Sequence, residues 1–263
     1  MFTRINNALL HWLICVNDHS LHSPFLFNTY KDLIRKKYQD PENIKNYLSQ
    51  LKSDNTIIEI EDYGAGSSRL KSNKRKIKNI AKTSTSSFHI RKIIYNYIIQ
   101  YKPECVLELG TNLGVTTLLM SEGSSLYGGQ IYSFEGSDSL SKLALKAFKN
   151  FGADNIKVIK GNLDSTLPSY LKAFDKKIDF VYMDANHTYE ATINYLNTIY
   201  PYLNENSAVL IGDIYWSEGM KKAWKEICSS GMFNTKLDFY HSGLLMKGPD
   251  IPLEHEILMS RPL

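Results

Sequence analysis

From residue 105 onward, short apolar runs alternate with longer stretches whose apolar side chains recur at helical spacing. The apolar runs predict strands at residues 105–109, 130–134, 156–159, 179–183 and 207–211. The stretches that follow them predict helices at residues 115–122, 138–150, 165–173, 189–202 and 217–229. Strands and helices in alternation form βα units, whose strands lie parallel with helices on both faces of the sheet. The sequence therefore predicts a doubly wound α/β domain.

The end of the chain extends this predicted sheet. Residues 235–240 and 243–247 are strand-like runs on either side of a short turn. They predict an antiparallel hairpin, which brings the mainly parallel sheet to seven strands.

The first part of the chain has a different pattern, with apolar residues at helical spacing up to about residue 55. Ser23 can cap a helix that begins at Pro24, and a further helix follows Pro41. We expect a helical N-terminal extension with a basic linker over residues 1–82 and the α/β domain over residues 83–263.

The cysteines and the apolar N-terminal run bear on location. Three widely spaced cysteines without a C-x-x-C pair favour a reducing compartment over a disulfide framework or a thiolate zinc site. The apolar run Leu9–Val16 is too short to span a bilayer, and no cleavage signal follows it. We expect a cytoplasmic protein with no transmembrane segment; the alternative is that this run lies against a membrane surface.

The turn after the first βα strand has the sequence Glu108-Leu-Gly-Thr-Asn-Leu-Gly114. Glycine allows unusual backbone angles and lets a ligand approach the main chain. The G-x-G-x-x-G pattern of dinucleotide sites is absent, which disfavours an NAD-dependent oxidoreductase. An acidic residue at the mouth of the turn would repel a pyrophosphate and suit a cationic group such as an ammonium.

This turn resembles the E/D-x-G-x-x-x-G motif of class I S-adenosylmethionine (SAM)-dependent methyltransferases. The resemblance implies a Rossmann-like fold and contacts between the methionine part of SAM and a set of residues in the turn: Glu108, Gly110, Thr111, Asn112 and Gly114. It also requires an acidic residue for the ribose hydroxyls at the end of the next strand, roughly twenty residues on. Glu135, followed by Gly136, ends that strand 21 residues after Gly114.

A second glycine turn, Asp62-Tyr-Gly-Ala-Gly-Ser67, competes for this role. Neither a strand nor an acidic residue lies about twenty residues after it, where the ribose ligand is needed. We interpret residues 57–68 as a loop or short hairpin.

The third strand is followed by Gly161-Asn-Leu-Asp164. The resemblance places a polar side chain and an apolar wall here, so Asn162 or Asp164 would bond the adenine amine and Leu163 would pack on the ring. The alternative is that Asp164 or Ser165 only caps the next helix.

The fourth strand continues into Asp184-Ala-Asn-His-Thr-Tyr189, which resembles a segment of the catechol-O-methyltransferase-like branch, in particular the family 24 methyltransferases. The resemblance extends over about residues 83 to 247 and implies that Asp184 lies near the transferred methyl group, as a catalytic and cofactor-binding residue. In that branch this acid often binds a divalent metal together with an Asp-Asn or Asp-Asp pair after the fifth strand. Here Ile214 follows Asp213, and Asn186 replaces a further acid, so we expect no metal.

His187 lies three residues after Asp184. An imidazole titrates near neutral pH and could act as the general base that deprotonates an acceptor hydroxyl. Alternatively, it hydrogen-bonds the backbone or the cofactor and orders the loop.

Between Tyr63 and Pro103 the chain has ten basic residues and no acidic one. This stretch could be a solvated surface, a site for a phosphorylated or carboxylated acceptor, or a grip on nucleic-acid phosphates. Nucleic acid is the least expected partner, because no aromatic residue for base stacking lies between Arg69 and Lys82.

The sequence thus predicts an enzyme that transfers the methyl group of SAM, in line, to a hydroxyl of a small acceptor that can be anionic. The alternatives are an RNA or protein methyltransferase that uses the basic stretch over residues 69–92, and a SAM-binding or scaffold protein without turnover. The apolar N-terminal helices could also join two copies as a homodimer.

Overall fold

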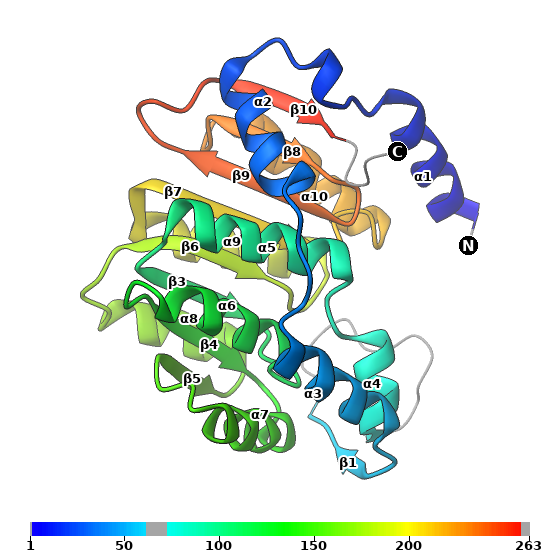
Figure 1. Ribbon diagram of the computed structural model, residues 1–263. Helices are drawn as coiled ribbons and strands as arrows, with labels where there is room; N and C mark the ends of the chain where they lie inside the picture. Colours follow the sequence, from blue (N-terminus) through cyan, green and yellow to red (C-terminus); the bar gives the residue numbers. More distant parts are fainter. Residues whose placement is uncertain (1, 62–72, 259–263) are drawn as a thin grey trace. The chain divides into compact units, whose positions relative to one another are not determined.

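The computed structural model describes residues 2–61 and 73–258 (Figure 1). These residues form two compact units. We call Tyr38–Lys176 the central unit, and Met1–Lys37 together with Lys177–Leu263 the split unit. The predicted boundary at residue 82 is a different division and stays a prediction.

The sheet of the central unit has the strand order β3-β4-β5, all parallel. Its strands are β3 (Cys105–Leu109), β4 (Gln130–Glu135) and β5 (Ile156–Lys160). Its helices are α5 (Phe88–Tyr101), α6 (Val115–Ser125), α7 (Asp138–Phe151) and α8 (Leu163–Lys172). All five residues of β3 are buried, which agrees with their sequence, a continuous apolar run with one carboxylate. Parallel pairing brings the carboxyl ends of the three strands to one edge.

The central unit begins with α3 (Glu42–Ser53), β1 (Ile57–Glu59), β2 (Lys74–Lys76) and α4 (Ile77–Thr83). Apolar residues of α3 and α4, such as Ile44 and Ile80, pack in one core with Leu118 of α6 and Phe148 of α7. β1 pairs antiparallel with β2. The predicted loop or hairpin over residues 57–68 thus contains a strand, whose partner lies beyond that range, and residues 62–68 are outside the described residues.

The sheet of the split unit has the order β10-β8-β9-β7-β6. Its strands are β6 (Ile178–Met183), β7 (Leu203–Gly212), β8 (Thr235–Asp238), β9 (Ser242–Lys247) and β10 (Glu254–Ile257), and its larger C-terminal helices are α9 (Tyr189–Ile199) and α10 (Glu218–Ser229). β6 and β7 are parallel, whereas β9 runs antiparallel to β7 and to β8. The α/β class and the C-terminal hairpin are confirmed. β10 was not predicted, because Glu-His-Glu-Ile lacks the apolar content of a strand.

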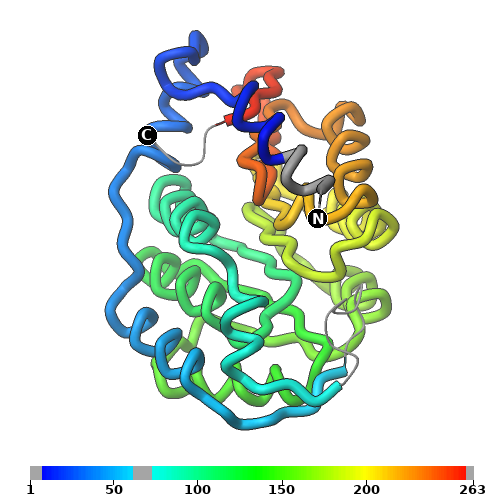
Figure 2. The backbone as a smooth tube through the Cα atoms, turned by 90° about the vertical axis from the view of Figure 1, so that its right-hand side faces the viewer, coloured from blue at the N-terminus to red at the C-terminus, as the bar shows by residue number. Residues whose placement is uncertain are grey.

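The N-terminal part of the split unit consists of α1 (Phe2–Ile14), the short helix η1 (Asp18–Ser20), α2 (Pro24–Tyr30) and the π-helical turn η2 (Lys31–Arg35). The predicted start of α2 is confirmed, since the Ser23 side chain accepts a hydrogen bond from the amide of Leu26. The amide of Val16 donates to the carbonyl of Ile257, so the segment after α1 lies beside the C-terminal strands, as Figure 2 shows. Within the described ranges, the helices are all too short or too polar to cross a membrane.

Candidate functional site

The glycine turn connects β3 to α6. Gly110 and Gly114 have φ angles of 102° and 75°, and Asn112 between them has 52°, all in the left-handed region. A Cβ atom on Gly114 would lie 2.6 Å from the ring of Phe148. The amides of Gly110 and Thr111 both donate to the carbonyl of Phe134 at 3.0 Å. Backbone angles, packing and hydrogen bonds therefore all fix the conformation of this turn.

Glu108 lies inside the central unit, with none of its surface exposed. Its Oε2 accepts hydrogen bonds from the hydroxyls of Thr117 at 2.6 Å and Ser133 at 2.5 Å. The carboxylate thus connects β3 to α6 and β4. Its predicted contact with the methionine part of SAM stays a prediction.

Glu135 ends β4 directly beside the glycine turn. Its Oε2 accepts from the amide of Asn112 at 2.7 Å, and its Oε1 accepts from the amide of Ser137 at 2.9 Å. Burial raises the pKa of Glu135, and the amides of Ser137, Asn112 and Gly136 offset part of this effect. A carboxylate with two directed donors is held in one orientation, and its other lone pairs can accept from a ligand hydroxyl.

Glu61 was not predicted from the sequence. Its Oε2 accepts from the hydroxyl of Ser137 at 3.0 Å and from the amide of Asp138 at 3.2 Å. Ser137 is the N-cap of α7 but makes no capping hydrogen bond with its own side chain. Glu61 provides this cap from 77 residues away, so no local pattern could have indicated it.

The turn after β5 reaches the same edge, because the amide of Gly161 donates to the carbonyl of Glu135 at 2.9 Å. The N-cap of α8 is Asn162, whose side chain accepts from the amide of Asp164 at 3.0 Å. The alternative that Asp164 or Ser165 caps this helix was therefore wrong. Leu163 follows and is buried. The adenine roles of Asn162 and Leu163 stay predictions.

A second group of predicted residues lies in the split unit, at the carboxyl ends of β6 and β7. The Nε2 atom of His187 lies 3.7 Å from Oδ1 of Asp184 and 3.9 Å from Oδ2 of Asp213. Gly212 precedes Asp213, and a Cβ atom there would lie 2.6 Å from Oδ1 of Asp184. The structure thus groups one imidazole with two carboxylates, all three partly exposed.

Asn186 does not join this group. It has a φ angle of 47°, its amide nitrogen donates to the hydroxyl of Tyr195 at 3.3 Å, and its oxygen accepts from Thr188 at 3.4 Å. Among residues 2–61 and 73–258, no cluster of three or more His, Cys, Asp or Glu could hold a metal ion. The possible metal ligands in the group around His187 are two carboxylates and an imidazole, whereas Mg²⁺ and Ca²⁺ prefer more oxygen ligands. The expectation of no metal rests on this chemistry and stays a prediction.

The structure corrects one part of the basic stretch. Arg91 is buried and forms a bidentate pair with Asp40, with distances of 2.8 Å from Nε and 2.6 Å from Nη2. Its Nη1 donates to the carbonyl of Ser86 at 2.5 Å. Arg91 is therefore an internal cation, unavailable to an anionic ligand, whereas Arg69 and Lys71 are outside the described residues.

Comparisons with known proteins agree with the predicted resemblance. Residues 107–214 match the Methyltransf_24 family, described as a methyltransferase domain. The O-methyltransferase hkm8 of Aspergillus hancockii is 28% identical over 144 residues, which are 53% of this chain and 55% of that protein. The chain thus spans about half the length of this curated relative.

Two solved structures show the same fold over most of the chain. The SAH-bound methyltransferase PaMTH1 of Podospora anserina is 16% identical, with a TM-score of 0.62 over 88% of this chain and 97% of that one. The O-methyltransferase of Bacillus cereus in complex with SAH is 13% identical, with a TM-score of 0.57 over 84% of this chain and 96% of that one. These matches confirm the doubly wound α/β fold predicted from the βα pattern and the Rossmann-like methyltransferase fold that the resemblance implied.

Proposed function

We propose that the chain is a SAM-dependent methyltransferase that methylates a hydroxyl of a small-molecule acceptor, because residues 107–214 match a family of methyltransferase domains and the chain resembles an O-methyltransferase. The observation that supports this most directly is the edge of the central sheet, where main-chain amides of the glycine turn and of Gly161 donate hydrogen bonds to the side chain and the carbonyl of Glu135.

Each turn at this edge receives one part of the cofactor. The glycine turn takes the methionine part through Glu108, Gly110, Thr111, Asn112 and Gly114. Glu135, with Gly136, accepts from the ribose hydroxyls, and Asn162 with Leu163 contacts the adenine. The orientation of the Glu135 carboxylate supports its assignment, because two backbone amides fix it before any ligand binds.

The group in the split unit provides the proton chemistry. SAM supplies an activated methyl group, so the protein has to position the acceptor hydroxyl and remove its proton. Neutral His187 accepts that proton. The carboxylates of Asp184 and Asp213, 3.7 and 3.9 Å away, stabilise the imidazolium that results.

The acceptor is a small molecule, and the basic residues between β1 and α5 favour one with an anionic group. Residues 1–82 form an extension that shapes the acceptor site next to a methyltransferase domain of residues 83–263. An RNA or protein substrate is not favoured, because the curated relative hkm8 is an O-methyltransferase and the guanidinium of Arg91 is paired with Asp40.

The test is SAH formation from SAM with a panel of phenols, sugars and hydroxy acids. His187→Ala should lower kcat on each accepted substrate by about 10²-fold or more, the usual contribution of a general base. Glu190→Gln changes an exposed acid in the same segment and should leave kcat unchanged. A His187→Ala enzyme with wild-type kcat would exclude His187 as the base, and a wild type that never releases SAH would contradict the enzyme assignment.

A homodimer is the second part of the proposal. Five apolar side chains of α1 are between 55% and 63% exposed: Leu9, Leu10, Trp12, Leu13 and Ile14. The sequence has no charge between Arg4 and Asp18, so two such helices can pack together without repulsion. Sedimentation should show a dimer for the wild type and a monomer for Leu13→Glu; a monomeric wild type would contradict the proposal.

A further inference from the structure

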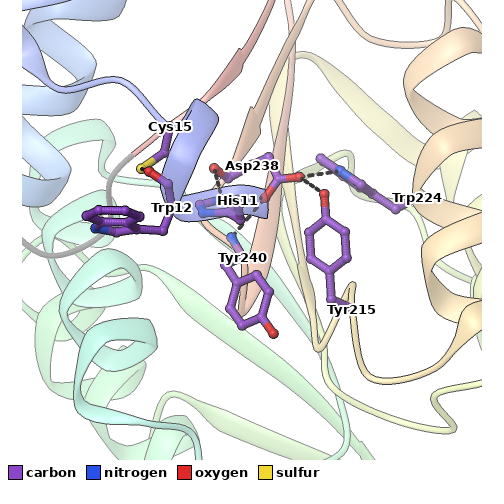
Figure 3. Close-up of polar contacts among 7 residues, drawn as sticks. All are labelled: His11, Trp12, Cys15, Tyr215, Trp224, Asp238 and Tyr240. Carbon is purple, nitrogen blue, oxygen red and sulfur yellow. Dashed lines mark hydrogen bonds and ion pairs between the residues drawn. The ribbon is translucent and has the colours of Figure 1, made fainter. Parts of the chain in front are cut away.

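Asp238, the last residue of β8, is a buried carboxylate with four hydrogen-bond donors around it (Figure 3). Its Oδ1 lies 3.1 Å from Nε2 of His11 and accepts from the amide of Tyr240 at 2.8 Å. Its Oδ2 accepts from the hydroxyl of Tyr215 at 2.7 Å and from Nε1 of Trp224 at 3.1 Å. The four donors come from α1, the β8–β9 turn, the β7–α10 loop and α10.

His11 attaches the N-terminal helix to this carboxylate across 227 residues of sequence. It is 8% exposed, whereas the large apolar side chains of α1 over residues 9–14 are more than half exposed. The contact of this part of α1 with the rest of the split unit is therefore centred on a polar side chain.

A buried carboxylate is costly unless its lone pairs are satisfied, and here all four donors are directed at it. Such a fully bonded group fixes the relative positions of the elements that supply the donors. Aromatic contacts add to this: the rings of Tyr215 and Tyr240 stack at 5.3 Å, and the His11 ring meets Tyr240 edge-on at 5.3 Å.

Two of the four donors, Tyr215 and the amide of Tyr240, belong to segments that are linked directly to Asp213. Tyr215 is two residues after it in the β7–α10 loop. On the other side, the amide of Asp213 donates to the carbonyl of His241 at 2.7 Å, directly after Tyr240. Tyr240 has a φ angle of 68°, which a residue with a side chain rarely adopts, and its amide is held by Asp238 in that conformation.

We propose that His11 and Asp238 are positioning residues of the acceptor side of the site. They hold the β7–α10 loop and the β8–β9 turn, and through them Asp213 beside His187. The N-terminal helix then acts on the functional site through the loops, although its own contact is with Asp238. This inference rests on the proposed methyl transfer for its purpose, but the positioning can be measured without it.

The test compares four variants by hydrogen–deuterium exchange of the full-length protein. His11→Ala removes the donor to Asp238, and His11→Gln restores one, because the glutamine amide nitrogen can reach the place of Nε2. Tyr215→Phe removes a single hydroxyl and serves if His11→Ala fails to fold. Lys225→Ala is the matched control, since it changes an exposed residue of α10 directly after the donor Trp224.

We expect His11→Ala and Tyr215→Phe to speed amide exchange in residues 213–217 and 239–241 by about tenfold, as the loss of one buried hydrogen bond implies. Exchange in β3, β4 and β6 should stay at the wild-type rate, and His11→Gln and Lys225→Ala should match the wild type. Faster exchange in all strands would show a general loss of stability and would overturn the proposal. Unchanged exchange in the two loops, or no rescue by His11→Gln, would overturn it as well.

A kinetic measurement connects the positioning to the reaction. For each panel acceptor that the wild type methylates, His11→Ala should raise the KM for the acceptor about tenfold while the KM for SAM stays within about twofold, since the residues proposed to bind ribose and adenine lie in the other unit. Equal losses for acceptor and SAM would contradict a role on the acceptor side. If the wild type methylates nothing, the proposed function fails, and the exchange experiment still decides whether His11 positions the loops.

Discussion

At the residue scale, Glu135 connects protonation to cofactor binding. Burial raises its pKa above the ordinary value of 4.5, and the amides of Ser137, Asn112 and Gly136 offset part of this. The ionised carboxylate is the form that accepts from the ribose hydroxyls. Because the folded pKa is raised, Glu135 also favours the folded state below the unfolded pKa, and this contribution is lost as the pH rises through the folded pKa.

We therefore predict that SAH affinity weakens as the pH falls through the raised pKa of Glu135, at a midpoint above 4.5. Calorimetric titrations at several pH values measure this midpoint. Glu135→Gln cannot ionise and should bind weakly with no such transition. An identical transition in Glu135→Gln would assign the titration to another group.

Gly114 allows a second prediction, with Gly128 as its control. Both have a positive φ angle, 75° and 82°, so alanine at either position is strained by about 1 kcal/mol. Only at Gly114 would the new Cβ also meet a neighbour, the Phe148 ring at 2.6 Å, whereas Gly128 has open space. Overpacking adds about 1–3 kcal/mol, so urea unfolding should show a larger loss for Gly114→Ala than for Gly128→Ala. Equal losses would contradict the close packing of the turn.

At this scale the sequence could indicate candidate residues that lie at the end of a strand or shortly after it. Glu135 was predicted from its sequence spacing after Gly114, and His187 from its position three residues after Asp184. Glu61 and Asp238 could not be predicted, because their partners are brought near only by the fold, over separations of 76 residues for Ser137 and 227 for His11.

At the scale of elements, the pair of Asp40 and Arg91 fixes the chain before α3 to the start of α5. Burial alone would raise the pKa of Asp40, but the hydrogen bonds from Arg91 and Tyr38 and the charge of Arg91 lower it below 3.8. Arg91 also donates to Ser86, in the segment where the Ser84 carbonyl accepts from the Asn112 side chain. This pair therefore supports the glycine turn indirectly.

Asp40→Asn should reduce the free energy of unfolding by about 3–5 kcal/mol at pH 7, since it leaves a buried cation without its partner. Glu42→Gln breaks the exposed pair with Lys45 and should change it by less than about 1 kcal/mol. Because the folded pKa of Asp40 is lowered, the difference between wild type and Asp40→Asn should shrink as the pH falls below 3.8. A difference that persists unchanged in acid would argue against an ion pair.

The elements that were predicted share a strong pattern. β3 is wholly buried and the start of α2 has both a capping serine and a proline, so their sequences are unambiguous. β2 and β10 are short and polar, β1 has only three residues, and each of these strands pairs with a partner strand. No local preference can show such pairing in advance.

At the scale of the whole molecule, the order of βα units and the final hairpin sufficed to predict a doubly wound sheet, and the resemblance of the glycine turn added the Rossmann-like methyltransferase fold. The division into units was not predictable, because the split unit joins the first helices to the last strands through contacts such as Val16 with Ile257. The acceptor is not encoded in any motif, since the residues that would contact it come from several loops.

The central claim is that the edge of the central sheet binds SAM through Glu135, and calorimetric titration with SAH tests it most directly. The wild type should bind one SAH per chain, Glu135→Ala should lose this binding, and Glu104→Ala, which removes an exposed acid just before β3, should bind like the wild type. A wild type that does not bind SAH, or a Glu135→Ala variant that binds it as tightly as the wild type, would contradict the account.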